Sequence, residues 1–200
     1  MNPRSPNEPP GGKSPAVPEQ KPPVSKGAVV AVMGGAAYAA ALLSGLAMWE
    51  GKKNVGYLDI AGIPTACYGD TKNVEVGKFY SDAECNQRLE RQAMAHMADV
   101  KRCTPNLTGY PLVAAGLLTY NIGASNYCSS SAARYYNAGR IAAGCKASLA
   151  WDRVTVKAKN TRQIGFSDCR PSKRPGYSSC KVRGLTNRRQ YEYKICMTGL

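Results

Sequence analysis

Twenty-three consecutive residues, from Gly27 to Trp49, carry no charge. A helix rises about 1.5 Å per residue, so a helix of this length could cross a hydrocarbon layer of roughly 30 Å. Three interpretations compete: a buried helix of a folded domain, a secretory signal cleaved near Ala39-Ala40-Ala41, and an uncleaved signal anchor. The length and the charged residues at both edges of the segment count against the buried helix.

The composition of residues 27–49 favours a weak anchor. Eight Ala, four Gly and one Ser stand against three Leu, with no Ile or Phe. Ala and Gly gain much less than Leu from a lipid environment. We therefore expect a membrane segment that can leave the bilayer. Residues 1–26 hold eight of the 13 prolines and are expected to form a disordered arm, because proline lacks an amide proton.

Eight cysteines all lie beyond this segment, the first at Cys67. No C-x-x-C pair is present and His96 is the only histidine, so neither a metal site nor another cofactor is expected. An even number of cysteines favours disulfides and an oxidising compartment for the chain after residue 49. Their pairing stays open at this stage, although Cys67 is expected to be structural, and Cys169 and Cys180 are close enough to bridge a loop.

The chain is strongly basic, with 27 Lys and Arg against 13 Asp and Glu and a net charge of +14. Such a charge predicts a polyanionic partner: nucleic acid, an anionic membrane or a bacterial wall. Residues 153–194 alone carry 12 basic residues against Asp168 and Glu192. No nucleic-acid motif accompanies them, so the wall is favoured and no nucleic-acid partner is expected.

The pattern after Trp49 predicts one α+β domain over residues 50–200. Glycine-punctuated residues 56–77 are typical of short strands and turns. Ser81 followed by Glu84 forms a capping box that opens a helix to about residue 100. Further helices are expected near residues 111–121, 132–136, 141–151 and 188–196. The expected fold is thus a small β lobe and a mainly helical lobe, preceded by the apolar helix 27–49.

Two carboxylates and a hydroxyl follow that helix at short intervals: Glu50, Asp59 and Thr65. Two carboxylates across a cleft can act as general acid and general base in glycoside cleavage. Spacing alone is weak evidence, because solvated surface carboxylates would give the same pattern.

The surrounding motif resembles that of the phage-type lysozymes, the bacteriophage endolysins of glycoside hydrolase family 24. Their pattern is E-G-x5-Y-x-D-x2-G-x2-T, continuing to G-Y-G-H-T, and later segments match in the same order. The apolar segment before the glutamate further resembles the signal-anchor-release subgroup. The matching positions and segments are Glu50, Gly51, Tyr57, Asp59, Gly62, Thr65, Gly69, Thr71, 80–84, 119–123, 137–139, Trp151, 184–189 and Glu192.

The resemblance implies a lysozyme-like fold and three catalytic roles. Glu50 would protonate the glycosidic oxygen from a partly desolvated site, Asp59 would stabilise the charged sugar ring and hold the attacking water, and Thr65 would orient that water. Attack from the opposite face would invert the anomeric configuration. Three further positions would line the substrate cleft: Thr71, Tyr120 and Asn121.

Two departures from the family pattern stand out. Asp70 replaces the histidine of G-H-T, so that residue's contribution is altered. Residues 155–182 form a basic insertion that contains Cys169 and Cys180, and the family supplies no role for it.

The expected protein is a monomeric endolysin that cleaves the β-1,4 bond between N-acetylmuramic acid and N-acetylglucosamine in peptidoglycan. It would sit in the host inner membrane through residues 27–49 and enter the periplasm on release. While that segment spans the bilayer, Glu50 would be held at the lipid surface, away from an assembled cleft. Two alternatives remain: an exported lysozyme with a cleaved signal, and a non-catalytic, membrane-tethered wall-binding protein.

Overall fold

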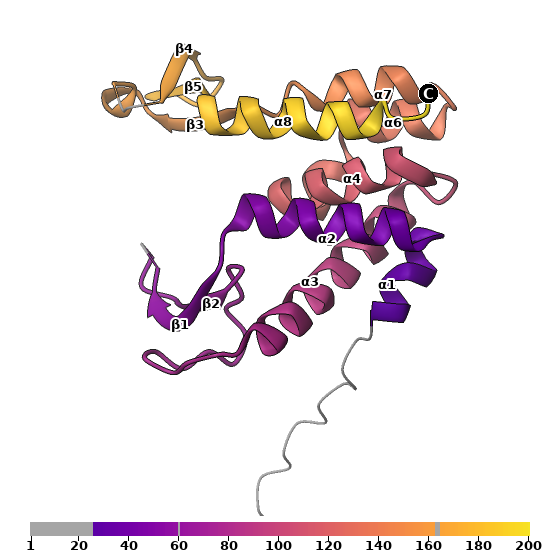
Figure 1. Ribbon diagram of the computed structural model, residues 1–200. Coiled ribbons are helices and arrows are strands. Elements are labelled where there is room, and N and C mark those ends of the chain that lie inside the picture. Colours follow the sequence, from indigo (N-terminus) through magenta and orange to yellow (C-terminus); the bar gives the residue numbers. More distant parts are fainter. Residues whose placement is uncertain (1–25, 60, 163–164) are drawn as a thin grey trace, which may run out of the picture.

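A computed structural model of the chain describes residues 26–59, 61–162 and 165–200 (Figure 1). The arm expected at residues 1–26 lies outside this part, apart from its last residue. A β-hairpin occupies one end of the molecule and a layered group of helices fills the rest. A second, three-stranded sheet lies at the same end as the hairpin, beyond the start of the last helix. The expected α+β fold is confirmed.

The apolar segment forms two helices rather than the single helix predicted over residues 27–49. Helix α1 spans Lys26–Met33 and α2 spans Ala36–Glu50, with a bend of 107° between them. Gly34 makes this break with φ of +75°, a left-handed conformation that glycine adopts without a steric cost. In the described part of the chain no single helix is both long and apolar enough to cross a bilayer, whereas the bent pair together reaches that length and composition.

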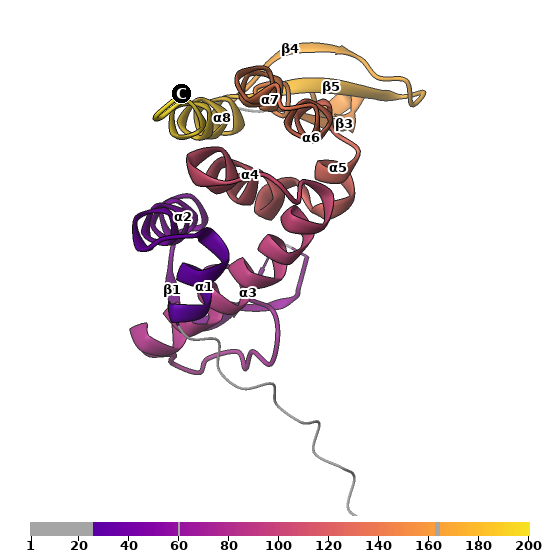
Figure 2. The ribbon, with the colours of Figure 1, turned by 90° about the vertical axis from the view of Figure 1, so that its right-hand side faces the viewer.

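Both helices pack into the core of the helical lobe. Val29, Met33, Leu42 and Leu46 are almost fully buried. Helix α4 (Gly109–Ile122) lies between α2 and α8 (Arg183–Cys196), as the turned view in Figure 2 shows. Its buried residues confirm the predicted apolar helix over 111–121.

Glycines allow α2 and α4 to approach closely. A Cβ added at Gly116 would come within 2.9 Å of Leu42, and one at Gly45 within 2.9 Å of Leu117. A larger side chain at either glycine would require the ends of these leucines, or of Met97 beside Gly116, to move, so the glycines help α2 and α4 to fit together.

The hairpin lobe consists of β1 (Lys53–Leu58) and β2 (Pro64–Cys67), paired antiparallel with Tyr57 opposite Thr65. The long helix α3 (Asp82–Cys103) follows it. Ser81 caps α3 through the predicted box, in which its side chain accepts from the Glu84 amide and Glu84 accepts from the Ser81 amide. The expected strands and the expected helix start are confirmed, and α3 runs three residues further than predicted.

Four helices complete the helical lobe: α5 (Ala124–Cys128), α6 (Ser131–Asn137), α7 (Ile141–Ser148) and α8. Two differ from the prediction in length. Helix α7 ends at Ser148 rather than Trp151, and α8 begins at Arg183 rather than Arg188, so the Gly-Leu-Thr-Asn stretch belongs to the helix.

The basic insertion forms a sheet of its own. Strands β3 (Arg153–Lys157), β4 (Phe166–Pro171) and β5 (Tyr177–Val182) are antiparallel in the order β3-β5-β4, and the short 3-10 helix η1 (Ala158–Asn160) follows β3. The sheet thus begins two residues before the predicted boundary at 155.

All eight cysteines are paired in disulfides. The pairs are Cys67–Cys85, Cys103–Cys128, Cys145–Cys196 and Cys169–Cys180. The structural role expected for Cys67 and the bridge expected between Cys169 and Cys180 are confirmed, and the other two pairs answer the open question of connectivity.

Candidate active site

Glu50 is the last residue of α2, where the chain turns at Gly51 towards the hairpin. Its Oε1 lies 2.8 Å from Nη1 of Arg188, which comes from α8. The Glu50 side chain is 24% exposed, whereas that of Arg188 is 6% exposed. The candidate acid is therefore partly removed from solvent and paired with a buried cation.

Arg188 joins Glu50 to a second, deeper carboxylate. Its Nε donates to Glu192 Oε1 at 3.2 Å, and Nη2 donates to the Leu117 carbonyl of α4 at 3.4 Å. Arg189 Nη2 also donates to Glu192 Oε1, at 2.6 Å. The result is a chain of charges from the surface at Glu50 to the core at Glu192.

Burial dominates the chemistry of Glu192, whose side chain is 1% exposed. Removal from water raises the pKa of Glu192 to about 7, although Arg189 and Arg188 act in the opposite direction. Burial likewise lowers the pKa of Arg189 below its usual value. Tyr136 and Asp152 are the other titratable groups that act on this pair.

We expect Glu192 to make the protein less stable as the pH rises. A carboxyl whose pKa is higher in the folded than in the unfolded chain stabilises the fold fully below the unfolded pKa of about 4.5, and this contribution is lost as the pH passes about 7. Glu192→Gln should abolish this dependence. The unfolding free energy of the wild type relative to the variant should therefore fall by about 1–3 kcal/mol between pH 5 and pH 8.

Chemical denaturation at several pH values measures this difference. Glu90→Gln is the matched control, because Glu90 is another buried glutamate, on α3, outside the charge network. A constant difference between the wild type and Glu192→Gln across pH 5–8 would contradict the assignment.

Asp59 and Thr65 lie in the hairpin, on either side of its turn. Asp59 Oδ1 accepts from the amides of Ala61 and Ile63 at 2.8 and 2.9 Å, so the loop holds one carboxylate oxygen in place. Its Oδ2 has no hydrogen-bond partner among the residues that the structure describes. Thr65, 4% exposed, donates its hydroxyl to the Ile63 carbonyl at 2.9 Å and keeps its lone pairs for another donor.

The three positions expected to line the cleft have different surroundings. Thr71 is exposed and borders a cavity of about 220 Å³ beside α3 that includes Gln92 and His96 but not Glu50. Tyr120 lies next to it, with its hydroxyl donating to Gln92 and its ring 4.8 Å from His96. Burial raises the pKa of Tyr120 and lowers that of His96.

Asn121 is connected to the charge network rather than to this cavity. Its Oδ1 accepts from Arg189 Nη2 at 3.2 Å. The structure thus joins Glu50 and Asn121 through Arg188, Glu192 and Arg189, and it places Thr71 and Tyr120 together at the edge of α3. That all three bind substrate stays a prediction.

Asp70, in place of the family's histidine, holds the hairpin lobe on α3. Its carboxylate is 3% exposed, and Oδ2 accepts from Arg88 and Arg91 at 2.8 and 3.0 Å. Asp70 lies at the end of a tight turn. Two backbone hydrogen bonds between Ala66 and Asp70, both of 2.9 Å, close this turn. The departure from the family pattern is therefore a carboxylate that binds two arginines.

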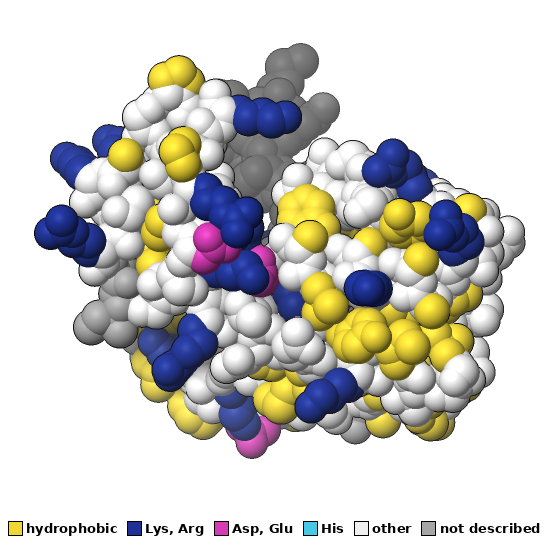
Figure 3. Space-filling model, turned by 90° about the horizontal axis from the view of Figure 1, so that it is seen from above, with side chains coloured by type: hydrophobic (Ala, Val, Ile, Leu, Met, Phe, Trp, Pro, Cys, Tyr) yellow, Lys and Arg dark blue, Asp and Glu magenta, His cyan; other side chains and the backbone are white. Residues whose placement is uncertain are grey.

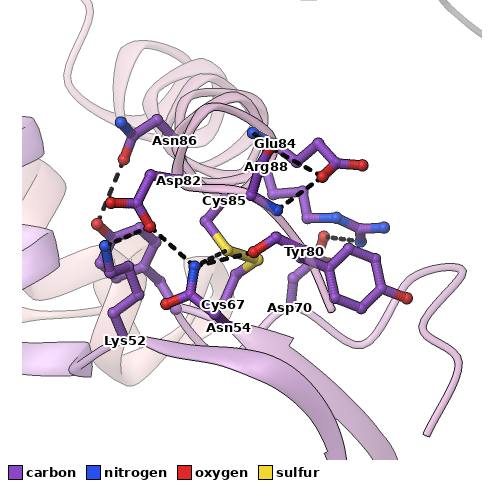
Figure 4. Close-up of a disulfide and its surroundings, with 12 residues drawn as sticks. Lys52, Asn54, Cys67, Asp70, Tyr80, Asp82, Glu84, Cys85, Asn86 and Arg88 are labelled. Carbon is purple, nitrogen blue, oxygen red and sulfur yellow. Dashed lines mark hydrogen bonds and ion pairs between the residues drawn. A yellow bond between two sulfur atoms is a disulfide. The ribbon is translucent and has the colours of Figure 1, made fainter. Parts of the chain in front are cut away.

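The disulfide Cys67–Cys85 lies in the middle of this junction, as Figure 4 shows. On one side of it Lys52 pairs with Asp82 at 2.8 Å and Asn54 donates to Asp82, and on the other Arg88 pairs with Asp70. Three kinds of bond thus fix β1, β2 and the following turn to the start of α3, which positions Asp59 and Thr65 relative to the helical lobe.

Among the described residues no group of three His, Cys, Asp or Glu side chains is arranged to hold a metal ion. The side chains around Glu50 are instead suited to acid-base chemistry. A carboxyl at the end of α2, paired with a buried arginine, and a second carboxylate in the hairpin are the kinds of group that acid-base glycoside cleavage requires.

Comparison with known proteins agrees with this chemistry. The family "Phage lysozyme" matches residues 47–192. The SAR-endolysin of Pseudomonas phage phiKMV is 32% identical over 171 residues, which cover 82% of this chain and 89% of the relative. The SAR-endolysin of Enterobacteria phage PA-2 is 30% identical, over 89% of this chain and 98% of the relative.

A solved structure has the same arrangement. The endolysin from Escherichia coli O157:H7 phage FAHEc1 superposes with a TM-score of 0.63 at 26% identity, covering 80% of this chain and 92% of that one. The chain belongs to the phage lysozyme family. It is a glycosidase of the endolysin type, which acts on bacterial peptidoglycan.

The family motif marks residues 184–189 and Glu192, but it implies no role for Arg188, Arg189 or Glu192. The signal that could have found them is their spacing, since residues 188 and 192 share one helix face. What the spacing could not provide is the partner Glu50, which lies 138 residues away in the chain.

Proposed function

We propose that the protein hydrolyses the β-1,4 bond between N-acetylmuramic acid and N-acetylglucosamine in peptidoglycan and thereby lyses the host cell. The observation that carries the proposal is the junction of α2 with the hairpin. Glu50, held by Arg188, ends α2, and after two residues the chain enters β1 of the hairpin, whose loop carries Asp59 and whose second strand carries Thr65.

Glu50 acts as the general acid in this proposal. Donation of a proton to the glycosidic oxygen requires the protonated carboxyl, so the ion pair with Arg188 must loosen when the glycan enters. Bound sugar displaces water from the exposed quarter of the side chain, and desolvation favours the neutral acid. Arg188 keeps a hydrogen-bond acceptor in Glu192 Oε1 when Glu50 is neutral.

Asp59 and Thr65 act on the opposite side of the sugar. The loop amides hold one oxygen of Asp59, which leaves the other oxygen available for the positive charge on the ring or for the attacking water. The Thr65 hydroxyl donates to the Ile63 carbonyl and can therefore accept a hydrogen bond from the same water. These roles support cleavage with inversion.

Product analysis tests the reaction. Purified sacculi digested with the protein and then reduced with borohydride should yield fragments that end in muramitol, and the anomer first formed should be α. Fragments ending in glucosaminitol would contradict the proposed bond, and a β anomer would contradict inversion.

We further propose that residues 27–49 anchor the protein in the host inner membrane before it is released into the periplasm in active form. Several curated relatives are named SAR-endolysins, among them those of phages phiKMV and PA-2. Retention of the segment is favoured over a cleaved signal, because cleavage near Ala41 would remove Val29, Met33 and Ala39 from the core. Intact-mass measurement of the periplasmic form distinguishes the two.

A further inference from the structure

The sheet β3–β5–β4 is a rigid basic surface attached to the active-site end of the molecule. Strand β5 ends at Val182 and α8 begins at the next residue. The disulfide Cys169–Cys180 joins β4 to β5 across the sheet, which gives the insertion a fixed shape in spite of its exposed position. A surface that is fixed in advance loses less entropy on binding.

Positive charge on this sheet is mostly uncompensated. Between Arg153 and Arg183 there are nine Lys and Arg residues and one acidic residue, Asp168. Asp168 pairs with Arg153 and Arg170 at 2.9 Å, and Lys181 pairs with Asp152 at 3.5 Å. The other six have no acidic partner within the described residues: Lys157, Lys159, Arg162, Lys173, Arg174 and Arg183.

Side chains on the sheet are exposed to a ligand. Basic groups outnumber acidic ones on the face seen in Figure 3. Arg174 lies over the ring of Tyr177, with 3.9 Å between its guanidinium carbon and the ring centroid. Stacking holds the guanidinium plane in position and leaves its N–H edge free to bind a carboxylate with two parallel hydrogen bonds.

The root of the sheet, at Arg183, lies close to the candidate acid, whereas Lys173 and Arg174 lie in the turn at the other end of β5, roughly 17 Å away along the strand. Five residues separate Arg183, at the root of the sheet, from Arg188, a rise of about 7.5 Å along α8. Arg188 in turn lies 2.8 Å from Glu50. Figure 1 shows the sheet, the end of α2 and the β1–β2 hairpin at the same end of the molecule, so a glycan bound at Glu50 passes beside the sheet.

We propose that this sheet binds the carboxylates of the stem peptides that peptidoglycan strands carry on N-acetylmuramic acid. The inference rests on the proposed function, since it assumes that the glycan lies at Glu50. The peptides leave the glycan beside the scissile bond and carry free carboxylates, so their charge is complementary to that of the sheet. Proximity of the root of the sheet to Glu50 favours this ligand over lipid phosphates in the released enzyme, because there α1 and α2 are packed in the domain rather than in the bilayer.

A pair of substrates tests the proposal: peptide-bearing peptidoglycan, and the same glycan after an amidase has removed its peptides, which leaves only the lactyl carboxylate on each muramic acid. The sheet variant Lys173→Gln/Arg174→Gln removes two exposed cations, and Arg134→Gln/Lys146→Gln removes two exposed cations from α6 and α7. The wild type should cleave the peptide-bearing substrate with the higher kcat/KM. In the sheet variant the ratio of kcat/KM on the two substrates should fall about fivefold, which is the effect of two exposed ion pairs.

The control variant should keep the preference of the wild type, and added salt should reduce that preference. An unchanged preference in the sheet variant overturns the proposal. If the same variant had also lost binding to anionic phospholipid vesicles, the partner of the sheet would be a membrane surface. Failure of the wild type to cleave either substrate would instead overturn the proposed function, so the two failures are distinguishable.

Discussion

Exchange of Glu50 for glutamine is expected to reduce peptidoglycan cleavage by about 10²–10⁴-fold, the range in which a general acid contributes. Glutamine has the size and polarity of the glutamic acid but no proton to donate to the leaving oxygen. Its amide oxygen can still accept from Arg188 Nη1, which lies 2.8 Å from Glu50 Oε1. The unfolding free energy should therefore change by less than about 1 kcal/mol, since the pair is partly exposed.

Turbidity clearing of permeabilised cells and thermal unfolding, measured on the same preparation, check both halves of this expectation. Glu75→Gln is the matched control, because Glu75 is an exposed glutamate of the hairpin lobe and its ion pair is with the neighbouring Lys78. It should clear cells at the rate of the wild type. Retained activity in Glu50→Gln would remove Glu50 from the mechanism, whereas absence of clearing by the wild type would support the non-catalytic alternative.

The double substitution Gly34→Leu/Gly35→Leu is expected to keep the protein in the membrane and to suppress lysis. Leucine at position 34 would have to adopt φ of +75°, which is strained for a residue with a Cβ, so the bend between α1 and α2 becomes unfavourable. Two leucines also add to the affinity of the segment for lipid, by roughly 0.3–0.6 kcal/mol each. Both effects shift the protein from the folded, released state towards the inserted one.

Ala36→Leu/Ala37→Leu separates these two effects. Both alanines are exposed on α2, so leucines there add lipid affinity without opposing the bend. Fractionation should find the glycine variant in the membrane pellet and inactive, whereas the alanine variant should still release and lyse, with a delay. Active enzyme in the membrane fraction of the glycine variant would contradict the idea that insertion keeps Glu50 from its cleft.

Local signals predicted the parts of the fold that depend on neighbouring residues. The capping box fixed the start of α3, and the unbroken apolar run fixed α4, because both act within a few residues. The bend after Met33 was missed, since hydropathy and helix length carry no information on direction. The three-stranded sheet was missed for a similar reason: its pairing joins β3 to β5, about twenty-five residues apart, with weak alternation in each strand.

The candidate site likewise contains residues that a local motif can identify and residues that only the packing of distant segments brings together. Glu50, Asp59 and Thr65 follow one another closely, so a family motif could identify them. Arg188 and Glu192 act through space, and their roles depend on the packing of α8 against α4. Asp70 shows the limit of a motif, because its departure from the family residue marked a change without indicating the two arginines that bind it.

The segment α1–α2 can be buried in either of two environments, the core of the domain or the lipid bilayer, and the two compete for it. Val29, Met33, Leu42 and Leu46 are buried in the domain, and the same side chains would face lipid in an inserted helix. Lipid that binds the segment binds only the opened protein, so by mass action it lowers the apparent stability of the fold. The free energy of unfolding then has no single value, but falls with the concentration of bilayer, and a vesicle titration becomes a denaturation experiment.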